Sequence, residues 1–439
     1  MNPYREVYVM KNIKTYVFTL GMVFFLAACT GNNPGPASQQ SDGQSNPADK
    51  GITLIAPEDT SMVSEKVKAY VDAMREQEKS LADPYKYDDL FGENGITVEN
   101  FLDEGEVAGQ NRTVSGSIPD RSDKSMGVNL SYTLSEELEA SDPKTIKIVV
   151  SKNSDLSDAK EIYTTLRTVN VNNLFVNTEY YWQVQVGSVY SEIGTFKTGD
   201  YPRWITARPM YNVRDNGGYM TVSGKRVKQG LVYRGGEITN RTWQEHLLTN
   251  AETSKKAFRE VMNIGVELDL RGPSDIGDGY NACAFAENGD IDYVQLAIKS
   301  YEQTFTQTRS NVAPIFEILK DADKKPVYYH CYGGADRTGT IGFLLNGLLG
   351  VSYTDLVIDF ELTSYSSINN EHIRNHIPGH QHQYDRWPKL IEQLQTDTTG
   401  GYAYDASLPL HENIENFLVK ACSVPQETIN TIRSIMLED

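Results

Sequence analysis

A cysteine and an arginine six residues apart mark the part of this chain whose residue types could do chemistry. Residues 327–339 read VYYHCYGGADRTG, and an apolar stretch follows them. A cysteine with an ordinary pKa of about 8.5 is mostly a thiol at neutral pH, so a nucleophilic Cys331 needs an electropositive setting. A turn from a strand into a helix supplies that setting, because backbone N–H groups and the helix N-terminus converge on one point.

The neighbours of Cys331 each suit a task in such a site. Gly333 and Gly334 permit unusual backbone angles and close approach of an oxyanion. Arg337 can grip two phosphate oxygens with its planar fork. Thr338 would stabilise the leaving thiolate, and His330 would fix the loop. The set fits attack of a thiolate on a phosphate ester, with a phosphocysteine that water then hydrolyses. The residues expected to surround the phosphate are Tyr332, Gly333, Gly334, Ala335, Asp336 and Arg337.

A general acid must protonate the leaving oxygen, and Asp336 inside the loop is the first candidate. About 30 residues before the cysteine, residues 297–302 contain no Asp, so Glu302 and Asp292 are the alternatives. A purely scaffolding role for Asp336 also stays open.

The pattern Cys-x5-Arg, with the preceding His and the following Thr-Gly, resembles the signature of the protein tyrosine phosphatase superfamily. With Asp336 directly before Arg337, it is most similar to the bacterial tyrosine phosphatases of the atypical dual-specificity-like group. Gly235 departs from that group's pattern, which has Ser there. The resemblance covers about 210–375. Many members of this superfamily take the general acid from a loop about 30 residues before the cysteine. Further stretches that match it are residues 212–218, 231–236, 268–271 and 359–363.

The resemblance implies an enzyme that hydrolyses phosphate monoesters, with protein phosphotyrosine as the first substrate. The alternative within the superfamily is a phosphoinositide or inositol phosphate. Relatives that act on such polyanions commonly carry Lys where this loop has Ala335. Local positive charge could still come from other residues, and neither a cofactor nor a metal is expected. The possible auxiliary residues are Arg214, Asp215, Arg234 and Arg271.

The order of strand-like and helical segments in residues 200–439 predicts an α/β phosphatase domain. Strand-like residues 266–271 and 326–330 alternate with helical stretches, which predicts a central, mostly parallel sheet flanked by helices. The helical stretches are residues 251–263, 312–320, 338–349, 414–420 and 427–437.

Residues 51–199 predict a β-sandwich interrupted by one helix over 63–79. Residues 144–151 and 180–186 alternate apolar and polar side chains. Residues 177–182 and 194–198 resemble the last two strands of fibronectin type III domains, whose Tyr and Trp belong to the core. We therefore expect Trp182 to be buried, although a carbohydrate platform is the alternative. The short linker suggests that the two domains pack together.

The N-terminal residues predict a lipoprotein signal peptide over 1–28. A basic segment with Lys11 and Lys14 precedes an apolar run that is too short to span a bilayer. The Leu-Ala-Ala-Cys that ends at Cys29 looks like the lipobox of bacterial lipoproteins, whose cysteine is lipidated. Residues 29–50 are mostly small and polar and predict a flexible tether. We expect a lipid-anchored protein of the cell envelope, at the periplasmic face or the cell surface.

The charge of the chain limits the classes of partner that it can be expected to bind. The chain has 439 residues and a formal charge of −18, which argues against nucleic acid as a partner. A lipoprotein that binds a glycan or protein through its sandwich is the hypothesis from another class. Cys283 and Cys422 could form a disulfide, but small buried side chains are the favoured interpretation. The expected partners are therefore a phosphorylated protein or small phosphate monoester and, through Cys29, a membrane.

Overall fold

The structure is a computed structural model in which residues 48–439 form one compact unit. It describes residues 51–80, 126–238, 251–276, 281–366 and 387–439, apart from 142, 144 and 209. The predicted signal peptide, Cys29 and the tether lie outside these ranges. Within them, no helix combines the length and the apolar character that crossing a bilayer requires.

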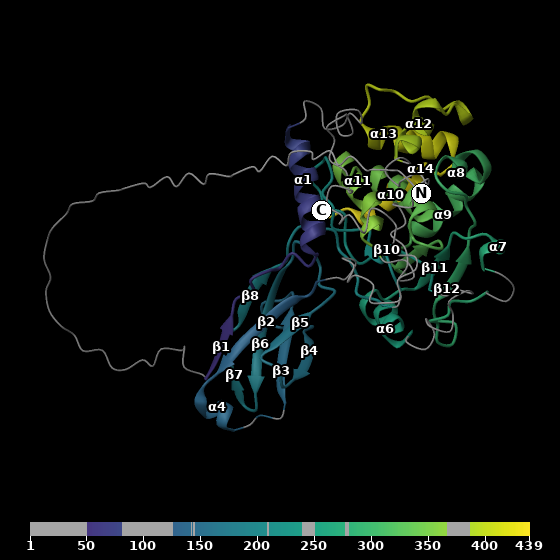
Figure 1. Ribbon diagram of the computed structural model, residues 1–439. Helices are drawn as coiled ribbons and strands as arrows, with labels where there is room; N and C mark the ends of the chain where they lie inside the picture. The colour runs from purple at the N-terminus through teal and green to yellow at the C-terminus, as the bar shows by residue number, and fades with distance from the viewer. Residues whose placement is uncertain are drawn as a thin grey trace, which may run out of the picture. The chain divides into compact units, whose positions relative to one another are not determined.

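Two antiparallel sheets occupy the first part of the described chain (Figure 1). One has the strand order β1-β2-β5, and the other has the order β4-β3-β6-β7, in which β8 also pairs with β6, at residues 179–182. Helix α4 (Glu136–Ala140) follows β2 and is capped by Ser135. The strands are β1 (Ile52–Ile55), β2 (Val128–Leu134), β3 (Ile146–Ser151), β4 (Lys160–Thr164), β5 (Thr168–Val171), β6 (Glu179–Val186), β7 (Val189–Tyr190) and β8 (Gly194–Lys197).

Alternation along β6 explains how these sheets acquire a core. Tyr180, Trp182, Val184 and Val186 are buried while the residues between them are not, as the period of two in a strand requires. Trp182 is 1% exposed and belongs to a cluster that both sheets supply. Its predicted place in the core is confirmed, and the interpretation of Trp182 as a carbohydrate platform is wrong. The fibronectin type III assignment stays a prediction.

A five-stranded sheet in the order β12-β11-β13-β10-β9 carries the rest of the chain. All neighbours pair in parallel except β9, so the predicted mostly parallel sheet is confirmed. Strand β13 lies in the centre, where it is covered on both faces and both edges. The strands are β9 (Arg214–Asp215), β10 (Val232–Gly235), β11 (Val266–Asp269), β12 (Asp292–Gln295) and β13 (Val327–His330).

The predicted helices are present, with small shifts at their ends. Two of them, α6 and α13, continue into π-helical turns at Ala257–Val261 and Phe417–Ala421. Short 3-10 turns lie at Arg309–Asn311, Leu362–Tyr365 and Thr399–Gly401. The α-helices after β10 are α6 (Ala251–Lys256), α7 (Pro273–Ile276), α8 (Glu302–Gln307), α9 (Val312–Leu319), α10 (Asp336–Leu348), α11 (Tyr353–Glu361), α12 (Trp387–Thr396), α13 (Leu410–Asn416) and α14 (Gln426–Met436).

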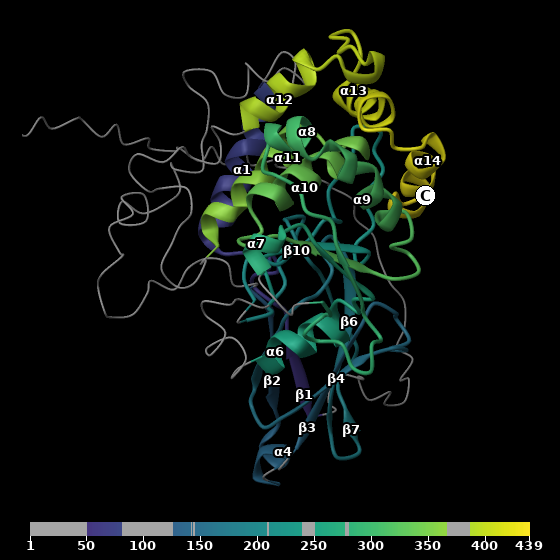
Figure 2. The same ribbon diagram turned by 90° about the vertical axis from the view of Figure 1, so that its right-hand side faces the viewer.

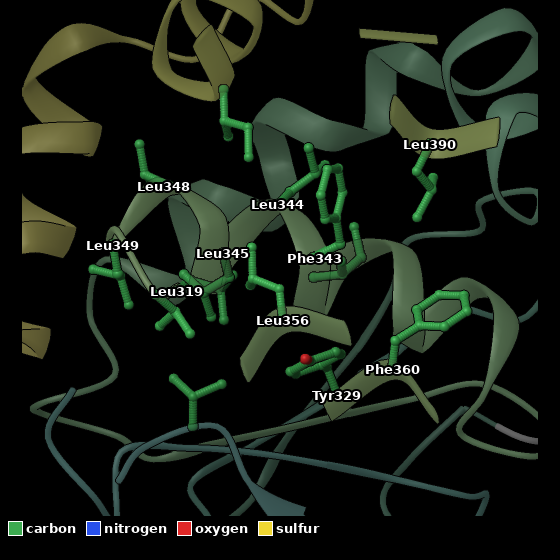
Figure 3. Packing of buried hydrophobic residues seen from close by; sticks show 14 of the residues in the cluster. Leu319, Tyr329, Phe343, Leu344, Leu345, Leu348, Leu349, Leu356, Phe360 and Leu390 are labelled. Atoms are coloured by element: carbon green, nitrogen blue, oxygen red, sulfur yellow. The ribbon is translucent and has the colours of Figure 1, made fainter. Parts of the chain in front are cut away.

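Each face of this sheet has its own hydrophobic cluster. Val327 and Tyr329 of β13 face the larger cluster, which contains α9, α10 and α11, and Tyr328 faces the smaller one beside α6. Figure 3 shows part of the larger cluster, to which Phe343, Leu344, Leu356, Phe360 and Tyr329 contribute. Helix α10 is buried nearly all round from Thr338 onward, which fixes the direction in which its N-terminus points.

Helix α1 (Glu65–Ser80) lies in the range predicted for the sandwich but packs into the larger cluster of the α/β part. Ser64 precedes the helix, and its hydroxyl accepts a hydrogen bond from the Val67 amide at 3.3 Å. It lies beside α11 in both Figure 1 and Figure 2. Arg75 forms an ion pair with Asp355 of α11 at 3.0 Å. The predicted bounds of 51–199 and 200–439 therefore stay a prediction, with α1 contributing to the core of the second range.

Met74 provides a test of this packing, because its side chain is 0% exposed in the larger cluster. Met74→Ala should lower the free energy of unfolding by about 2–5 kcal/mol. Urea denaturation followed by tryptophan fluorescence measures the change. Lys79→Ala on the exposed side of the same helix is the control and should change stability by less than about 0.5 kcal/mol. Equal stability of the two variants would show that α1 does not belong to this core.

Candidate active site

The ends of three parallel strands bring the site together. Gly235 of β10, His330 of β13 and Asp269 of β11 lie in register across the sheet. The chain then turns from β13 into α10 through residues 331–335, and Cys331 is 1% exposed at the first position. The predicted strand, loop and helix are therefore present. The carboxyl edge of a parallel sheet is where ligands bind in open α/β folds.

The carbonyl groups of the loop are held from behind. The side-chain amide of Asn212 donates to the carbonyl oxygens of Gly333 and Gly334 at 3.0 and 3.1 Å, and Arg234 donates to that of Gly334 at 3.3 Å. In a trans peptide the N–H points away from the C=O. Fixing these carbonyls toward the interior therefore turns the following amides the other way, as a cradle for an anion requires. Sequence reasoning placed Asn212 within a motif but gave it no role.

Gly334 lies against the end of β10. Its φ is +67°, and a Cβ there would lie 2.3 Å from the backbone carbon of Gly235. Only glycine fits this combination of angle and space. Gly235 is equally confined, since its own Cβ would lie 2.3 Å from the hydroxyl oxygen of Tyr328. Tyr328 thus fills the space that a Ser at position 235 would need.

Two buried arginines share one carboxylate beneath the loop. Arg214 donates to the Asp359 carbonyl at 3.0 Å and to its carboxylate at 3.4 Å, and Arg234 binds the other carboxylate oxygen. Both arginines are 0% exposed. Burial and the neighbouring Arg234 lower the pKa of Arg214, while the two arginines hold the pKa of Asp359 below its usual range despite burial. These arginines act on the loop from inside the protein, not on a ligand at its mouth.

The imidazole of His330 joins the loop to β11. Its Nε2 lies 2.9 Å from Glu267 and its Nδ1 lies 3.1 Å from the carbonyl oxygen of Cys331. Burial lowers the pKa of His330, but Asp269 and Glu267 outweigh burial and raise it overall. A charged imidazole next to the cysteine favours a thiolate. The fixing role predicted for His330 agrees with this geometry.

Arg271 and Glu237 complete a buried group of charges at this edge. Arg271 donates to both carboxylate oxygens of Asp269, at 2.7 to 3.1 Å, and binds Glu237 through Nη1. The backbone N–H of Glu237 donates to the Tyr332 carbonyl at 3.0 Å, which places this residue beside the loop. Glu267, Asp269 and His330 have ligand atoms within 4.8 Å of one another, a spacing that could hold a metal ion. Because Arg271 and His330 already bind these carboxylates, the set is an ion-pair network.

This network contains more acids than bases. Three carboxyl groups, those of Glu237, Glu267 and Asp269, accompany Arg271 and His330, and each of the five is at most 2% exposed. Burial raises the pKa of Glu237 to about 8, although Arg271 and His330 oppose the rise. Its Oε1 is buried without a hydrogen-bond partner among the described residues. A neutral Glu237 balances the charges of the group, and sequence reasoning missed this residue.

The arginine of the loop has an acidic neighbour. Arg337 binds the carboxylate of Asp275 in α7 through Nη1, and its side chain is 17% exposed. Burial lowers the pKa of Arg337, but the nearby Cys331 and Asp275 raise it overall. Arg337 is the second residue of α10, so it directly follows the loop. Nothing in the sequence around Asp275 indicated this pairing, since it depends on how α7 follows β11.

The three candidates for the general acid lie in different places. Asp336 begins α10, and its carboxylate accepts a hydrogen bond from the hydroxyl of Tyr301. Glu302 follows Tyr301, and its Oε2 is buried without a partner in the described part of the chain. Asp292 is paired with Val266 at the amino end of β11, and it binds Lys325. The alternative assignment of Asp292 is wrong, because it lies at the opposite end of the sheet from Cys331.

Of the other predicted site residues, some lie at the loop and one lies away from it. The hydroxyl of Thr338 is buried without a hydrogen-bond partner among the described residues, and Ala335 is the buried residue before α10. Tyr332 is half-buried and its carbonyl also accepts a hydrogen bond from Tyr211 at 3.0 Å. Asp215 does not join the loop. Its carboxylate binds Arg203 and two backbone amides, so it holds the turns around β9.

Cys283 and Cys422 are both free and buried, in different hydrophobic clusters. Their favoured interpretation as small buried side chains is confirmed. Burial, with Glu267 as the next cause, raises the pKa of Cys283 well above its usual range. Burial also raises the pKa of Cys422 to about 12, so neither thiol is a nucleophile near neutral pH.

Comparison of the sequence with models of protein families identifies the family of this chain. A model described as the tyrosine phosphatase family matches residues 205–438, more than half of the chain. The chain belongs to this family. The matched range contains β9 to β13 with the Cys331 loop at the centre, so the phosphatase fold and the sequence signature coincide.

Solved structures similar to this phosphatase include two proteins. The core catalytic domain of the PP-IP phosphatase SIW14 from S. cerevisiae, in complex with citrate, shares 16% identity over 33% of this chain and 73% of its own, with a TM-score of 0.23. TpbA from P. aeruginosa shares 13% identity over 34% and 83%, with a TM-score of 0.23. A cysteine-to-serine variant of TpbA in complex with pTyr shares 11% over 38% and 89%, with a TM-score of 0.22. Similarities of this size assign no substrate. No curated protein sequence matches the chain significantly.

The proton on Glu237 predicts how the stability of the phosphatase depends on pH. A carboxyl whose pKa rises from 4.5 in the unfolded chain to about 8 in the fold binds more protons when folded. Its contribution is therefore fully present below pH 4.5 and is lost as the pH rises through about 8. Glu237→Gln should remove this loss, which amounts to at most about 1.4 kcal/mol per pH unit.

Urea denaturation at a series of pH values between about 5 and 9 checks this expectation. The exposed Glu260 supplies the control variant, Glu260→Gln, which should follow the wild-type curve. A Glu237→Gln protein whose stability falls with pH as steeply as the wild type would contradict the assignment of the proton to Glu237.

Proposed function

We propose that this phosphatase hydrolyses phosphate monoesters, with protein phosphotyrosine as its substrate, through a phosphocysteine on Cys331. The observation that carries the proposal is the loop itself. Its carbonyls are bonded to Asn212 and Arg234 behind it, and its N–H groups lie at the start of a buried helix of 13 residues. Such a loop binds a tetrahedral dianion, and a nucleophile at its first residue lies in line for attack on phosphorus.

The reaction has two steps. The thiolate of Cys331 attacks phosphorus, the S–P bond forms, and the P–O bond to the leaving group breaks as Asp336 gives that oxygen its proton. Water then attacks phosphorus, Asp336 accepts a proton from it, and the thiolate leaves with inorganic phosphate as the product. Arg337 and the loop amides hold the three equatorial oxygens in both steps. Thr338 stabilises the leaving thiolate, and His330 keeps it charged.

The charges around the loop favour a single phosphate group. Arg214, Arg234 and Arg271 are each at most 1% exposed and bind carboxylates of the protein itself. They therefore do not offer free positive charge to a second phosphate. The loop has one cation, Arg337, and Ala335 where relatives that act on polyanions carry Lys. With a chain charge of −18, a highly charged inositol phosphate gains no attraction at long range.

For the N-terminal part we propose a lipid anchor at Cys29, which would hold the enzyme at the cell envelope on a flexible tether of residues 29–50. The two sheets around Trp182 share a core, which supports a fibronectin type III-like domain for residues 51–199. Hydrogen bonds such as that from the Val176 amide to Gln229, at 2.8 Å, support packing of this domain on the phosphatase. The sheets would then act as a spacer between the membrane and the loop.

Cys331→Ser tests the mechanism. Turnover of p-nitrophenyl phosphate should vanish, because a serine hydroxyl is not ionised in this setting, whereas binding of tungstate as a phosphate analogue should persist. Steady-state kinetics and isothermal titration calorimetry measure the two properties. Undiminished turnover by the variant would contradict a phosphocysteine intermediate on Cys331.

A second experiment tests the substrate class. The wild-type protein should have a higher kcat/KM for phosphotyrosyl peptides than for inositol phosphates. A wild-type preference for inositol phosphates would contradict phosphotyrosine as the substrate.

Asp336→Asn tests the general acid. Loss of the proton donor should lower kcat/KM for an alkyl phosphate by about 100-fold or more, since poor leaving groups need protonation. The effect on p-nitrophenyl phosphate should be much smaller, because its leaving group departs readily as an anion. Glu302→Gln is the matched comparison and should leave the ratio of the two substrates unchanged. If Glu302→Gln and not Asp336→Asn changes that ratio, Glu302 is the acid.

A further inference from the structure

The segment in which many tyrosine phosphatases carry their general acid here supplies a tyrosine. Tyr301, at the start of α8, is bound to the first turn of α10 at two points. Its hydroxyl donates to Oδ1 of Asp336, and its backbone N–H donates to the hydroxyl oxygen of Thr340 at 3.0 Å. The Thr340 hydroxyl in turn donates to the carbonyl oxygen of Asp336 at 2.9 Å. Tyr301 thus holds the side chain of Asp336 directly and its backbone through the Thr340 hydroxyl.

The position of Tyr301 is itself fixed. Its backbone has φ 51° and ψ −131°, a region that bulky residues rarely adopt. The side chain is 8% exposed, and its ring lies 6.3 Å from that of Phe360. A buried ring, a strained backbone and two hydrogen bonds to one turn leave the hydroxyl little freedom. Tyr301 therefore presents its O–H to Oδ1 of Asp336 in a fixed direction.

We propose that Tyr301 is the positioning residue for proton transfer by Asp336, a role that rests on the proposed function. With Oδ1 held by the tyrosine hydroxyl, Oδ2 carries the proton toward the leaving oxygen. As the P–O bond breaks, that proton passes to the leaving oxygen and Asp336 becomes a carboxylate. The hydrogen bond from Tyr301 strengthens at this moment, because a hydroxyl binds a carboxylate more strongly than a neutral carboxyl. Tyr301 keeps its own proton throughout.

A positioning residue can be distinguished from one that only packs in the core. Removing a positioning residue should lower kcat/KM more for substrates with a more basic leaving group, which needs a proton more. Tyr301→Phe removes the hydroxyl and keeps the buried ring, so the shape of the core is preserved. Tyr402→Phe is the matched control, since Tyr402 is a buried tyrosine of the larger cluster whose hydroxyl has no hydrogen-bond partner among the described residues.

The experiment measures kcat/KM for a series of aryl and alkyl phosphates whose leaving groups differ in basicity. For Tyr301→Phe we expect a fall of about tenfold or more with the alkyl esters, the size of a lost hydrogen bond to a charged group, and little change with p-nitrophenyl phosphate. The slope of log kcat/KM against leaving-group basicity should therefore steepen. Tyr402→Phe should keep the wild-type slope.

The double variant Tyr301→Phe/Asp336→Asn separates the proposed role from a structural one. If Tyr301 acts through Asp336, adding Tyr301→Phe to Asp336→Asn should cost no further activity. Equal losses with all esters, or multiplying losses in the double variant, would overturn the role of Tyr301 and leave the proposed function intact. A wild-type protein that hydrolyses none of the esters would overturn the proposed function, and this role with it.

Discussion

The carboxylate of Asp359 is the interaction on which the active-site loop depends. It is shared by Arg214 and Arg234, which are 0% exposed, and it offsets one of their two positive charges in the core. Arg234 in turn binds the carbonyl of Gly334, and Arg214 binds Asn212, which holds the same loop. Removing one partner from such a buried group leaves an uncompensated charge, which costs more than the pair contributes. The loop is therefore only as well ordered as the ion pairs beneath it.

The sequence was sufficient to predict the parts of this site that depend on local order. A strand, a glycine-rich turn and a helix in succession form a compact local pattern, and the structure has all three at residues 327–348. The parallel sheet and the burial of Trp182 follow equally from periodicity. These features need no knowledge of which distant segments meet.

The parts that sequence reasoning missed depend on register between distant segments. Glu237 and Arg271 meet because β10 and β11 flank β13 and end level with it, and Tyr301 reaches Asp336 because α8 starts beside α10. Asp292 failed as an acid for the same reason, since only the strand pairing shows that it lies at the other end of the sheet. Helix α1 was correctly expected from its apolar stripe, but the stripe does not say which core it will join.

The contact between Gly235 and Tyr328 restricts how related sequences can vary. A side chain at 235 would need the space taken by the tyrosine hydroxyl, which itself donates to the carbonyl of Gly236 at 2.6 Å. In this chain a Ser at position 235 would therefore force the Tyr328 hydroxyl away from the Gly236 carbonyl. A shorter residue at 328 would make room for that Ser, so Gly235 and Tyr328 are coupled through one contact in the core.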